Sequence, residues 1–319
     1  MSAVRELAAG LWRIRLPLHF ELNHVNVHVL RIDSGFLLVD CGYGTDESFE
    51  ALESGLRETG VAWSDIREIL ITHCHPDHAG NAERVRERTG APVVMHETEN
   101  AYLPHFRRLV AEPGLLDPWL LSWGAPPEAV DRIRDSFADM TGTYRPAEAG
   151  RVLRGGDTLH GWAVIATPGH APGHVCLHDA ARGLLISGDH VLEAISPNIA
   201  WLAHRDALAD YLASLERVAL LSADRVYPSH GDPFGGLQAR CRALAGHHDL
   251  RCNNILNALA AGGETAQQIV ERLWRRMLSP FQHRFALFEV MAHLAYLENS
   301  GRTTCDRSAE VHRWIRTPA

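Results

Sequence analysis

The sequence predicts a mixed α/β (α+β) fold in two parts, and three observations lead to this prediction. Short apolar segments alternate with helical patterns over roughly the first 230 residues. Several of these segments end at Gly or Pro and are followed directly by His or Asp. From about residue 234 onward, helical patterns replace the strand signals. We therefore expect a large domain over residues 1–245 and a small, mainly helical domain over residues 246–319.

The first part opens with strands and helices in turn. Segments rich in Val, Leu and Ile predict strands over Leu11–Pro17, Asn26–Ile32, Gly35–Asp40, Glu68–Thr72 and Pro92–His96. The spacing of Phe49, Leu52 and Leu56 predicts a helix over Asp46–Thr59 that stops at Gly60. A second helix is expected over about Ala79–Arg88.

Residues 97–145 interrupt this alternation with an apolar segment of helical character. An insertion of this size between core strands is usually functional or an accessory cap. Phe106, Trp119 and Trp123, together with Trp201 further along the chain, could line a pocket for an apolar acyl group. The alternative is that these aromatic side chains form the insertion's own small core.

Strand signals resume after the insertion and end before the tail. Strands are expected over Thr158–Thr167, His174–His178, Gly183–Ser187 and Arg225–Tyr227, and Asp206 is expected to cap a helix. A long helical pattern then covers Phe234–Ala261, Thr265 and Gln268 form a capping-box signature for a helix to Trp274, and a further helix ends near Gly301. With a hairpin over residues 301–305, this order resembles a winged helix, a module for DNA binding, for packing or for dimerisation.

Composition and charge narrow the function classes. The 319 residues are 46% hydrophobic and 22% charged, which is ordinary for a globular protein. No stretch approaches the ~20 apolar residues of a membrane span. The N-terminus lacks a signal-peptide pattern, so a cytoplasmic location is expected. The chain contains no lysine, which removes Walker-type loops and Schiff-base mechanisms, and its charge of −8 disfavours a broad nucleic-acid footprint. Its six cysteines include no CxxC pair.

A cluster of metal-ligand residue types follows the strand expected over 68–72. His73, His75, Asp77 and His78 fall within six residues. Imidazole nitrogen and carboxylate oxygen are the ligands that zinc and similar divalent metals prefer. Alternate side chains of an extended segment point to one side, so His73 and His75 point together while Cys74 points away. The cluster predicts a site for two ions.

Three later segments place further ligand types at the tips of expected strands. His170 lies in Thr-Pro-Gly-His, Asp189 in Ser-Gly-Asp-His, and His230 in Pro-Ser-His-Gly. Strand tips are where a rigid scaffold brings together ligands from distant parts of a chain. We therefore expect these three residues to meet the 73–78 cluster.

These motifs, in this order, resemble those of the metallo-β-lactamase superfamily. The run from Thr72 to Gly80, the Pro-Gly-His, Gly-Asp and Ser-His-Gly motifs, and an opening Val-Asp-Cys-Gly at residues 39–42 carry the resemblance over about residues 10–235. It implies a four-layer αββα sandwich with a catalytic domain over residues 1–245. The metals would lie in a cleft at one edge of the sheets.

The resemblance also implies a role for each motif residue. One metal would be held by His73, His75 and His170, the other by Asp77, His78 and His230, and Asp189 would bridge them. Asp40 and His190 would support the ligands from outside. Two divalent ions are expected, zinc first, although iron and manganese accept the same ligands. Asp77 and Asp189 would be the catalytic carboxylates, because two such ions lower the pKa of a bridging water toward about 7.

With its helical insertion and tail, the layout resembles thioesterase- or esterase-like members of this superfamily. This resemblance implies a hydrolase that acts on a small-molecule acyl substrate, including lactones. One alternative is a metal-dependent phosphodiesterase or nuclease. Another is a mononuclear iron dioxygenase of sulfur compounds, which would need only His73, His75 or His170, and Asp189. A binding protein without turnover is also retained. Assembly as a homodimer is left open.

Overall fold

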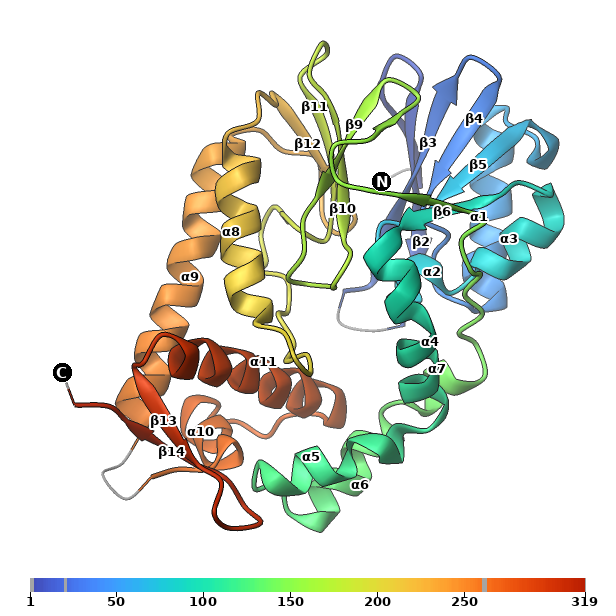
Figure 1. Cartoon of the computed structure of the whole chain (residues 1–319). Coiled ribbons are helices and arrows are strands. Elements are labelled where there is room, and N and C mark those ends of the chain that lie inside the picture. The colour runs from blue at the N-terminus through green and yellow to red at the C-terminus, as the bar shows by residue number, and fades with distance from the viewer. Residues whose placement is uncertain (1–2, 20–21, 260–262, 319) are drawn as a thin grey trace.

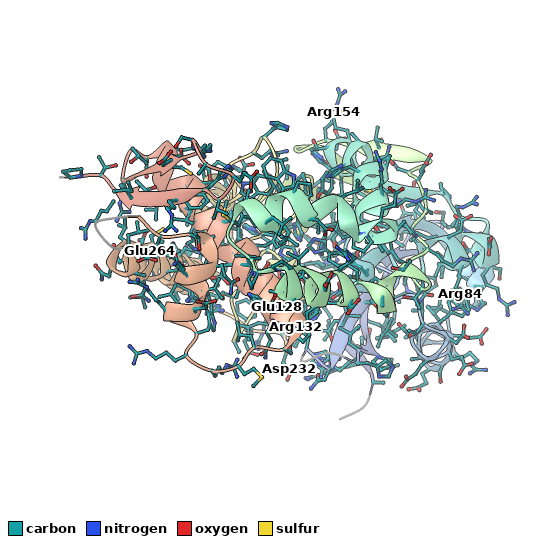
Figure 2. All side chains as sticks on the ribbon, turned by 90° about the horizontal axis from the view of Figure 1, so that it is seen from below. Arg84, Glu128, Arg132, Arg154, Asp232 and Glu264 are labelled. Atoms are coloured by element: carbon teal, nitrogen blue, oxygen red, sulfur yellow. The ribbon has the colours of Figure 1, made fainter. Side chains whose placement is uncertain are left out.

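Two β-sheets packed face to face form the centre of the molecule, and helices cover the outer side of each (Figure 1). The computed structural model describes residues 3–19, 22–259 and 263–318. The predicted four-layer αββα order is confirmed. Apolar side chains of both sheets, such as Leu37, Leu70 and Val164, are buried against one another between the sheets. Charged groups such as Arg154 project from the surface (Figure 2).

The first sheet follows the chain order from β1 to β7. Its strands are β1 (Val4–Ala8), β2 (Leu11–Pro17), β3 (His24–Ile32), β4 (Gly35–Val39), β5 (Ile66–Leu70), β6 (Val93–His96) and β7 (Arg151–Leu153). Strands β1 to β4 pair antiparallel, whereas β4 to β7 pair parallel. The C-terminal ends of β4 and β5 therefore lie at the same edge of the sheet.

The second sheet has the strand order β12-β11-β10-β9-β8. Its strands are β8 (Thr158–Leu159), β9 (Trp162–Ala166), β10 (Val175–Asp179), β11 (Leu184–Gly188) and β12 (Arg225–Pro228). Strand β11 pairs parallel with β12, and β10 pairs antiparallel with both β9 and β11. Strands β9, β11 and β12 therefore run in the same direction, and the segments that follow them leave the sheet at one edge.

The outer helices begin and end at residues suited to those positions. Helices α1 (Asp46–Thr59), α2 (Pro76–Ala79) and α3 (Ala82–Thr89) lie beside the first sheet, and α8 (Ala207–Ala219) and α9 (Leu237–Ala258) lie beside the second (Figure 1). Thr45 caps α1 by accepting a hydrogen bond from the Ser48 amide, and Asp206 caps α8 in the same way. The apolar face of α1 buries Leu52 and Leu56 against the sheet.

The insertion and the C-terminal segment meet at the end of the molecule away from the sheets. The insertion forms α4 (Glu97–Ala111), η2 (Pro113–Leu116), α5 (Asp117–Ser122), α6 (Pro127–Asp135) and α7 (Ala138–Thr141), and the tail adds α10 (Ala266–Leu273), α11 (Pro280–Asn299), β13 (Thr303–Asp306) and β14 (Arg313–Arg316). The Gln267 amide donates to the Trp123 carbonyl at 3.1 Å, and the His312 amide donates to the Ser122 carbonyl at 2.7 Å. Backbone hydrogen bonds thus join α5 to the tail.

Most expected elements are present, but some differ from the prediction. The helix expected over 79–88 is two helices, because the Gly80 carbonyl accepts from the Arg145 amide instead of from its own helix. Strands β1 and β7 were missed because they lie at the two edges of the sheet, where Val152 is largely exposed and the apolar pattern is short. The predicted end of the long helix, residues 260–261, lies outside the described residues.

The proposed division of the chain at residue 245 stays a prediction, and helix α9 runs through that residue without a break. The tail has the predicted order of helices followed by a two-stranded hairpin. Within the described ranges, no helix has both the length and the apolar character needed to cross a bilayer.

Candidate metal centre

Four strand ends deliver the predicted ligands to one place. The turn after β5 carries His73, His75, Asp77 and His78, while His170, Asp189 and His230 follow β9, β11 and β12. The turn tightens at Pro76, which starts α2 and places Asp77 and His78 within its single turn. The structure therefore brings together all seven residues that the sequence singled out as ligands, although they are spread over residues 73–230 of the chain.

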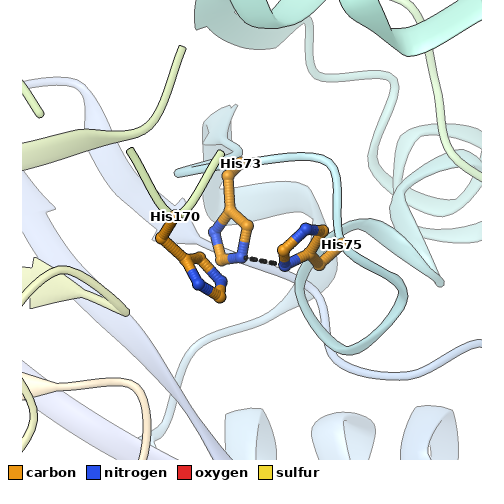
Figure 3. A group of neighbouring side chains, drawn as sticks. All are labelled: His73, His75 and His170. Atoms are coloured by element: carbon orange, nitrogen blue, oxygen red, sulfur yellow. Dashed lines mark hydrogen bonds between the residues drawn. The ribbon is translucent and has the colours of Figure 1, made fainter. Parts of the chain in front are cut away.

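Three histidines form the first group of ligand atoms. One nitrogen from each of His73, His75 and His170 lies within 4.8 Å of the others (Figure 3). His73 Nε2 and His75 Nδ1 face each other at 3.0 Å. Two ring nitrogens at this distance must share a proton or a cation, because two bare lone pairs would repel. Cys74, between them, points into the apolar core as expected.

Asp77, His78 and His230 form the second group, within the same limit of 4.8 Å. Asp77 Oδ2 lies 3.2 Å from His230 Nε2 and 3.6 Å from His78 Nε2. The carboxylate of Asp189 lies between the two groups. Its Oδ2 is 3.5 Å from His170 Nε2 and 3.4 Å from His230 Nε2, and its Oδ1 is 3.6 Å from His78 Nε2.

The outward-facing nitrogens of three histidines are fixed by acceptors. Nδ1 of His78 donates to Asp40 Oδ2 at 2.9 Å, and Asp40 also accepts from the Thr72 amide. Nδ1 of His170 donates to the Asn198 carbonyl, and Nδ1 of His230 donates to the His24 carbonyl, both at 2.8 Å. Because carbonyl and carboxylate oxygens only accept, each Nδ1 carries a proton, and when the ring is neutral each Nε2 presents a lone pair to the site.

The inward-facing atoms are buried and lack partners in the described structure. Nε2 of His78, His170 and His230 and Oδ1 of Asp189 have no hydrogen bond there. Buried polar atoms are normally paired, so four orphaned atoms converging on one place require an explanation. Divalent cations supply it, since lone pairs of imidazole and carboxylate are their preferred ligands. The residues present therefore fit a divalent-metal centre.

The pKa shifts of the ligand residues indicate which of them carry a proton when no cation is bound. Burial by itself would lower the pKa of His78 and His230, but Asp77 and Asp189 outweigh it. The pKa of His230 rises to about 10, and that of His78 rises well above its usual value. Burial lowers the pKa of His75 to about 3. Without metal, two protons on His78 and His230 therefore balance the carboxylates.

Glu99, which the sequence analysis did not single out, ties two ligand-bearing turns together. This carboxylate, at the start of α4, is fully buried. It accepts from the Cys74 amide at 2.8 Å and from the Gly173 amide at 2.6 Å. A side chain at Gly173 would lie 2.3 Å from the Glu99 amide, so glycine is required there. The only sequence signal was an acidic residue in the first turn of a helix, which usually marks a solvated N-terminus.

Other missed residues support the remaining turns. The side-chain amide of Asn26 donates to the carbonyls of Pro228 and Gly231 and so fixes the turn that carries His230. An asparagine inside an apolar strand was a usable signal, because a buried amide needs partners. His174 Nε2 accepts from the Asp189 amide at 3.1 Å. Gly188, with φ +52°, leaves room for this ring, since a Cβ there would lie 2.5 Å from His174 Nε2.

His190 occupies a different position from the one expected. Its ring packs against Tyr211, with the ring centroids 5.1 Å apart, and among the described residues it makes no hydrogen bond to a predicted ligand. Its carbonyl accepts from the Tyr211 hydroxyl at 3.0 Å. The support that the sequence assigned to His190 is instead given by His174, which contacts the Asp189 backbone directly.

The four aromatic residues predicted to line a pocket separate into two places. Phe106 lies beside the ligands, with its ring centroid 5.6 Å from that of His75. Trp119 and Trp123 pack around Trp201 at 4.8 and 5.1 Å. Trp123 also packs on Phe288 of α11 at 5.2 Å. The tryptophans therefore pack between the insertion and the tail, which differs from both the predicted pocket and a core within the insertion alone.

Replacing Glu99 by Gln should weaken metal binding. The amide nitrogen of Gln would face one of the two backbone N–H donors, so one turn would lose its acceptor. We expect zinc affinity to fall about 10–100-fold and unfolding to become easier by about 1–3 kcal/mol. Glu97→Gln is the control, because Glu97 lies on the same helix and pairs with exposed Arg154 at 2.7 Å. Zinc titration with a competing chelator measures the affinity, and unchanged affinity in Glu99→Gln would contradict the assigned role.

Metal binding should release protons. The raised pKa values keep His78 and His230 protonated at neutral pH in the metal-free site, and each must become neutral to bind a cation. Apparent zinc affinity should therefore rise with pH up to about 10, the pKa of His230.

Zinc calorimetry at pH 7.5 in buffers of different ionisation enthalpy should show a release of about two protons per chain. His230→Gln should release about one fewer. A binding enthalpy that does not depend on the buffer would show that these two histidines are already neutral.

Two family models match this chain. The model of the metallo-beta-lactamase superfamily matches residues 21–230, and a model of a metallo-beta-lactamase-like C-terminal domain matches residues 252–317. The two matches leave residues 231–251 between them, a gap that contains most of α9.

Individual proteins agree with the family models. Probable metallo-hydrolase YqjP of Bacillus subtilis (strain 168) is 28% identical over 299 residues, which cover 89% of this chain and 91% of that protein. Acyl-coenzyme A thioesterase MBLAC2 of Gallus gallus is 28% identical over 243 residues, covering 73% and 82%. The crystal structure of a beta-lactamase domain protein from Burkholderia ambifaria superposes with a TM-score of 0.87 at 33% identity, covering 98% of this chain and 94% of that one. The chain belongs to the metallo-β-lactamase superfamily and is a metal-dependent hydrolase.

Proposed function

We propose that this protein hydrolyses a thioester or carboxylic ester of a small acyl compound at a site that holds two divalent ions, with zinc as the first expectation. The position of Asp189 carries the two-ion part of this proposal. Its two carboxylate oxygens approach His170 on one side and His78 and His230 on the other at 3.4–3.6 Å. A carboxylate placed between two ligand groups can bind both ions, and a single-ion site would leave Asp77, His78 and His230 without a purpose.

When bound, a pair of divalent ions polarises a carbonyl oxygen and lowers the pKa of water toward about 7. The residues of this chain position those ions and handle the proton. The side chain of Asp77 is 19% exposed, whereas those of His78 and His230 are almost fully buried. Asp77 is therefore the carboxylate best placed to receive a proton from water and pass it to solvent or to the leaving group.

The surroundings of His75 favour an apolar group on the substrate. Phe106 packs on the His75 ring, and Tyr144 packs edge-on against Phe106 at 5.7 Å. The Tyr144 hydroxyl donates to the Cys74 carbonyl, and the Tyr211 hydroxyl donates to the His190 carbonyl. We expect a lactonase to place a free hydroxyl beside the metals. The hydroxyls of Tyr144 and Tyr211 are both engaged in other hydrogen bonds, so neither can act as that donor. This ranks thioesters and open-chain esters ahead of lactones.

The named relatives favour the thioester. MBLAC2 is named an acyl-coenzyme A thioesterase, and its match covers 73% of this chain. A nuclease would need a broad basic surface for its polyanionic substrate, and the net charge of −8 disfavours one. An iron dioxygenase would leave the second ligand group unused. Thioester hydrolysis uses all seven ligand residues and the apolar surface of Phe106.

A substrate panel should separate these reactions. Purified, zinc-loaded protein is expected to cleave acyl thioesters faster than aryl esters or lactones, with negligible turnover of bis-aryl phosphates. Asp189→Ala should lower kcat/KM by at least about 10³-fold, because it removes the carboxylate between the two ligand groups. Asp135→Ala, at an exposed position on α6, should behave as wild type. Preferential cleavage of the phosphates would reverse the ranking, and retained activity in Asp189→Ala would contradict the proposed site.

A further inference from the structure

Arg284 of α11 is a buried cation without a counterion. Only 8% of the residue is exposed, and no carboxylate among the described residues pairs with it. The other arginine buried to this degree, Arg13, pairs with Asp232 at 2.9 Å. Arginine is almost never buried unless it is paired, because removing its charge from water is costly. The position of Arg284 therefore requires an explanation beyond packing.

Aromatic rings surround the guanidinium and leave most of its donors unused. Its central carbon lies 4.1 Å from the ring centroid of Phe137, 5.2 Å from that of Phe281 and 5.4 Å from that of Phe285. The hydrogen bond that it makes within the described chain is a long one, from Nη1 to the Ser136 carbonyl at 3.5 Å. Rings satisfy the faces of a guanidinium by cation–π contact, but its N–H donors lie along the edge. Among the described residues, Nε and Nη2 of Arg284 donate no hydrogen bond.

Arg284 lies where three segments that border the metal centre meet. Phe137 belongs to the insertion that also supplies Phe106. The carbonyl of the next residue, Phe285, accepts from the side chain of Asn198, whose own carbonyl holds His170. Burial lowers the pKa of Arg284 to about 10, and the nearby Tyr43 opposes this shift. Tyr43 belongs to the loop in which the Cys41 amide donates to the His78 carbonyl. The guanidinium is thus connected to both ligand groups through neighbouring residues.

We propose that Arg284 binds an oxyanion of the substrate, a carboxylate or a phosphate placed away from the scissile bond. The inference rests on the proposed function, since it names the substrate class of that site. The unused Nε and Nη2 donors form a planar fork that matches two oxygens of such a group. The apolar rings around the guanidinium lower the local dielectric constant, which strengthens such a pairing. The substrate would then be an acyl thioester or ester that carries an anionic group.

The test compares thioesters that differ only in charge. N-Acetylcysteamine thioesters with acyl chains of equal length end in a methyl group or in a carboxylate. Coenzyme A thioesters of the methyl-ended chain add phosphates on the thiol side. Arg284→Met keeps an unbranched side chain and removes the charge. We expect it to raise KM about tenfold or more for the anionic substrate, with KM for the neutral thioester within about twofold of wild type. Which anionic substrate responds identifies the source of the oxyanion.

Arg251→Met is the matched control. Arg251 also lies in the C-terminal part and stacks on a ring, Trp274, at 4.6 Å, but it pairs with Glu289 at 2.9 Å. Its loss should leave both KM values unchanged. Arg284→Lys should recover part of the discrimination, because lysine restores the charge without the fork.

Thermal unfolding separates substrate binding from a structural role. Removing an unpaired buried charge should leave the unfolding temperature of Arg284→Met unchanged or higher, whereas removing a structural cation would lower it. Wild-type KM values combined with a lower unfolding temperature would overturn the proposal. An equal rise in KM for neutral and anionic thioesters would also overturn it.

A binding measurement keeps the proposal independent of turnover. Added glutarate should raise the unfolding temperature of the wild-type protein and have a smaller effect on Arg284→Met. If no thioester is cleaved but glutarate still protects the wild type selectively, the proposed function fails and the anion site stands. Equal protection of both proteins, or protection of neither, would contradict the anion site.

Discussion

The structure depends on imidazole nitrogens that are directed inward and buried before any cation binds. Imidazole nitrogens of His78, His170 and His230 have no partner in the site, yet each ring is held by a hydrogen bond on its other nitrogen. Such an arrangement is costly in a metal-free protein, because buried polar atoms lose the hydrogen bonds that water would give them. Hydrogen bonds on the side of each ring that faces away from the site hold the ligands in position, so that a cation binds to ligands that are already in place.

The outer contacts link the metal centre to the parts of the chain that lie outside the sandwich. Glu99, at the first helix of the insertion, holds the turns of His75 and His170 through backbone amides. Asn198 connects His170 to helix α11 of the C-terminal part. Insertion and tail also share the tryptophan core around Trp123. The two segments therefore contribute to the geometry of the site and to the surface that faces the substrate, and the proposed role of Arg284 is an extension of the same contacts.

The sequence predicted which residues meet at the site, because each of them lies in a short motif. A histidine or aspartate next to glycine at a strand tip can be recognised without coordinates, and all seven such residues meet in the structure. Residues that support the site through contacts with distant parts of the chain are not marked by any motif in the local sequence. Glu99 resembled an ordinary acidic residue at a helix start, and Asn198 acts through its backbone carbonyl, which any residue could supply. The ring of His190 packs against Tyr211, because Asp189 and His190 lie in the turn after β11, where adjacency in sequence does not place two side chains on the same side.

Anomalous X-ray diffraction at the zinc absorption edge, on crystals of the zinc-loaded protein, tests the central claim most directly. The account predicts two peaks, one among His73, His75 and His170 and one among Asp77, His78 and His230, with the Asp189 carboxylate contacting both. A single peak, or peaks away from these side chains, would contradict the account that the inward-facing lone pairs are held in place for a pair of cations.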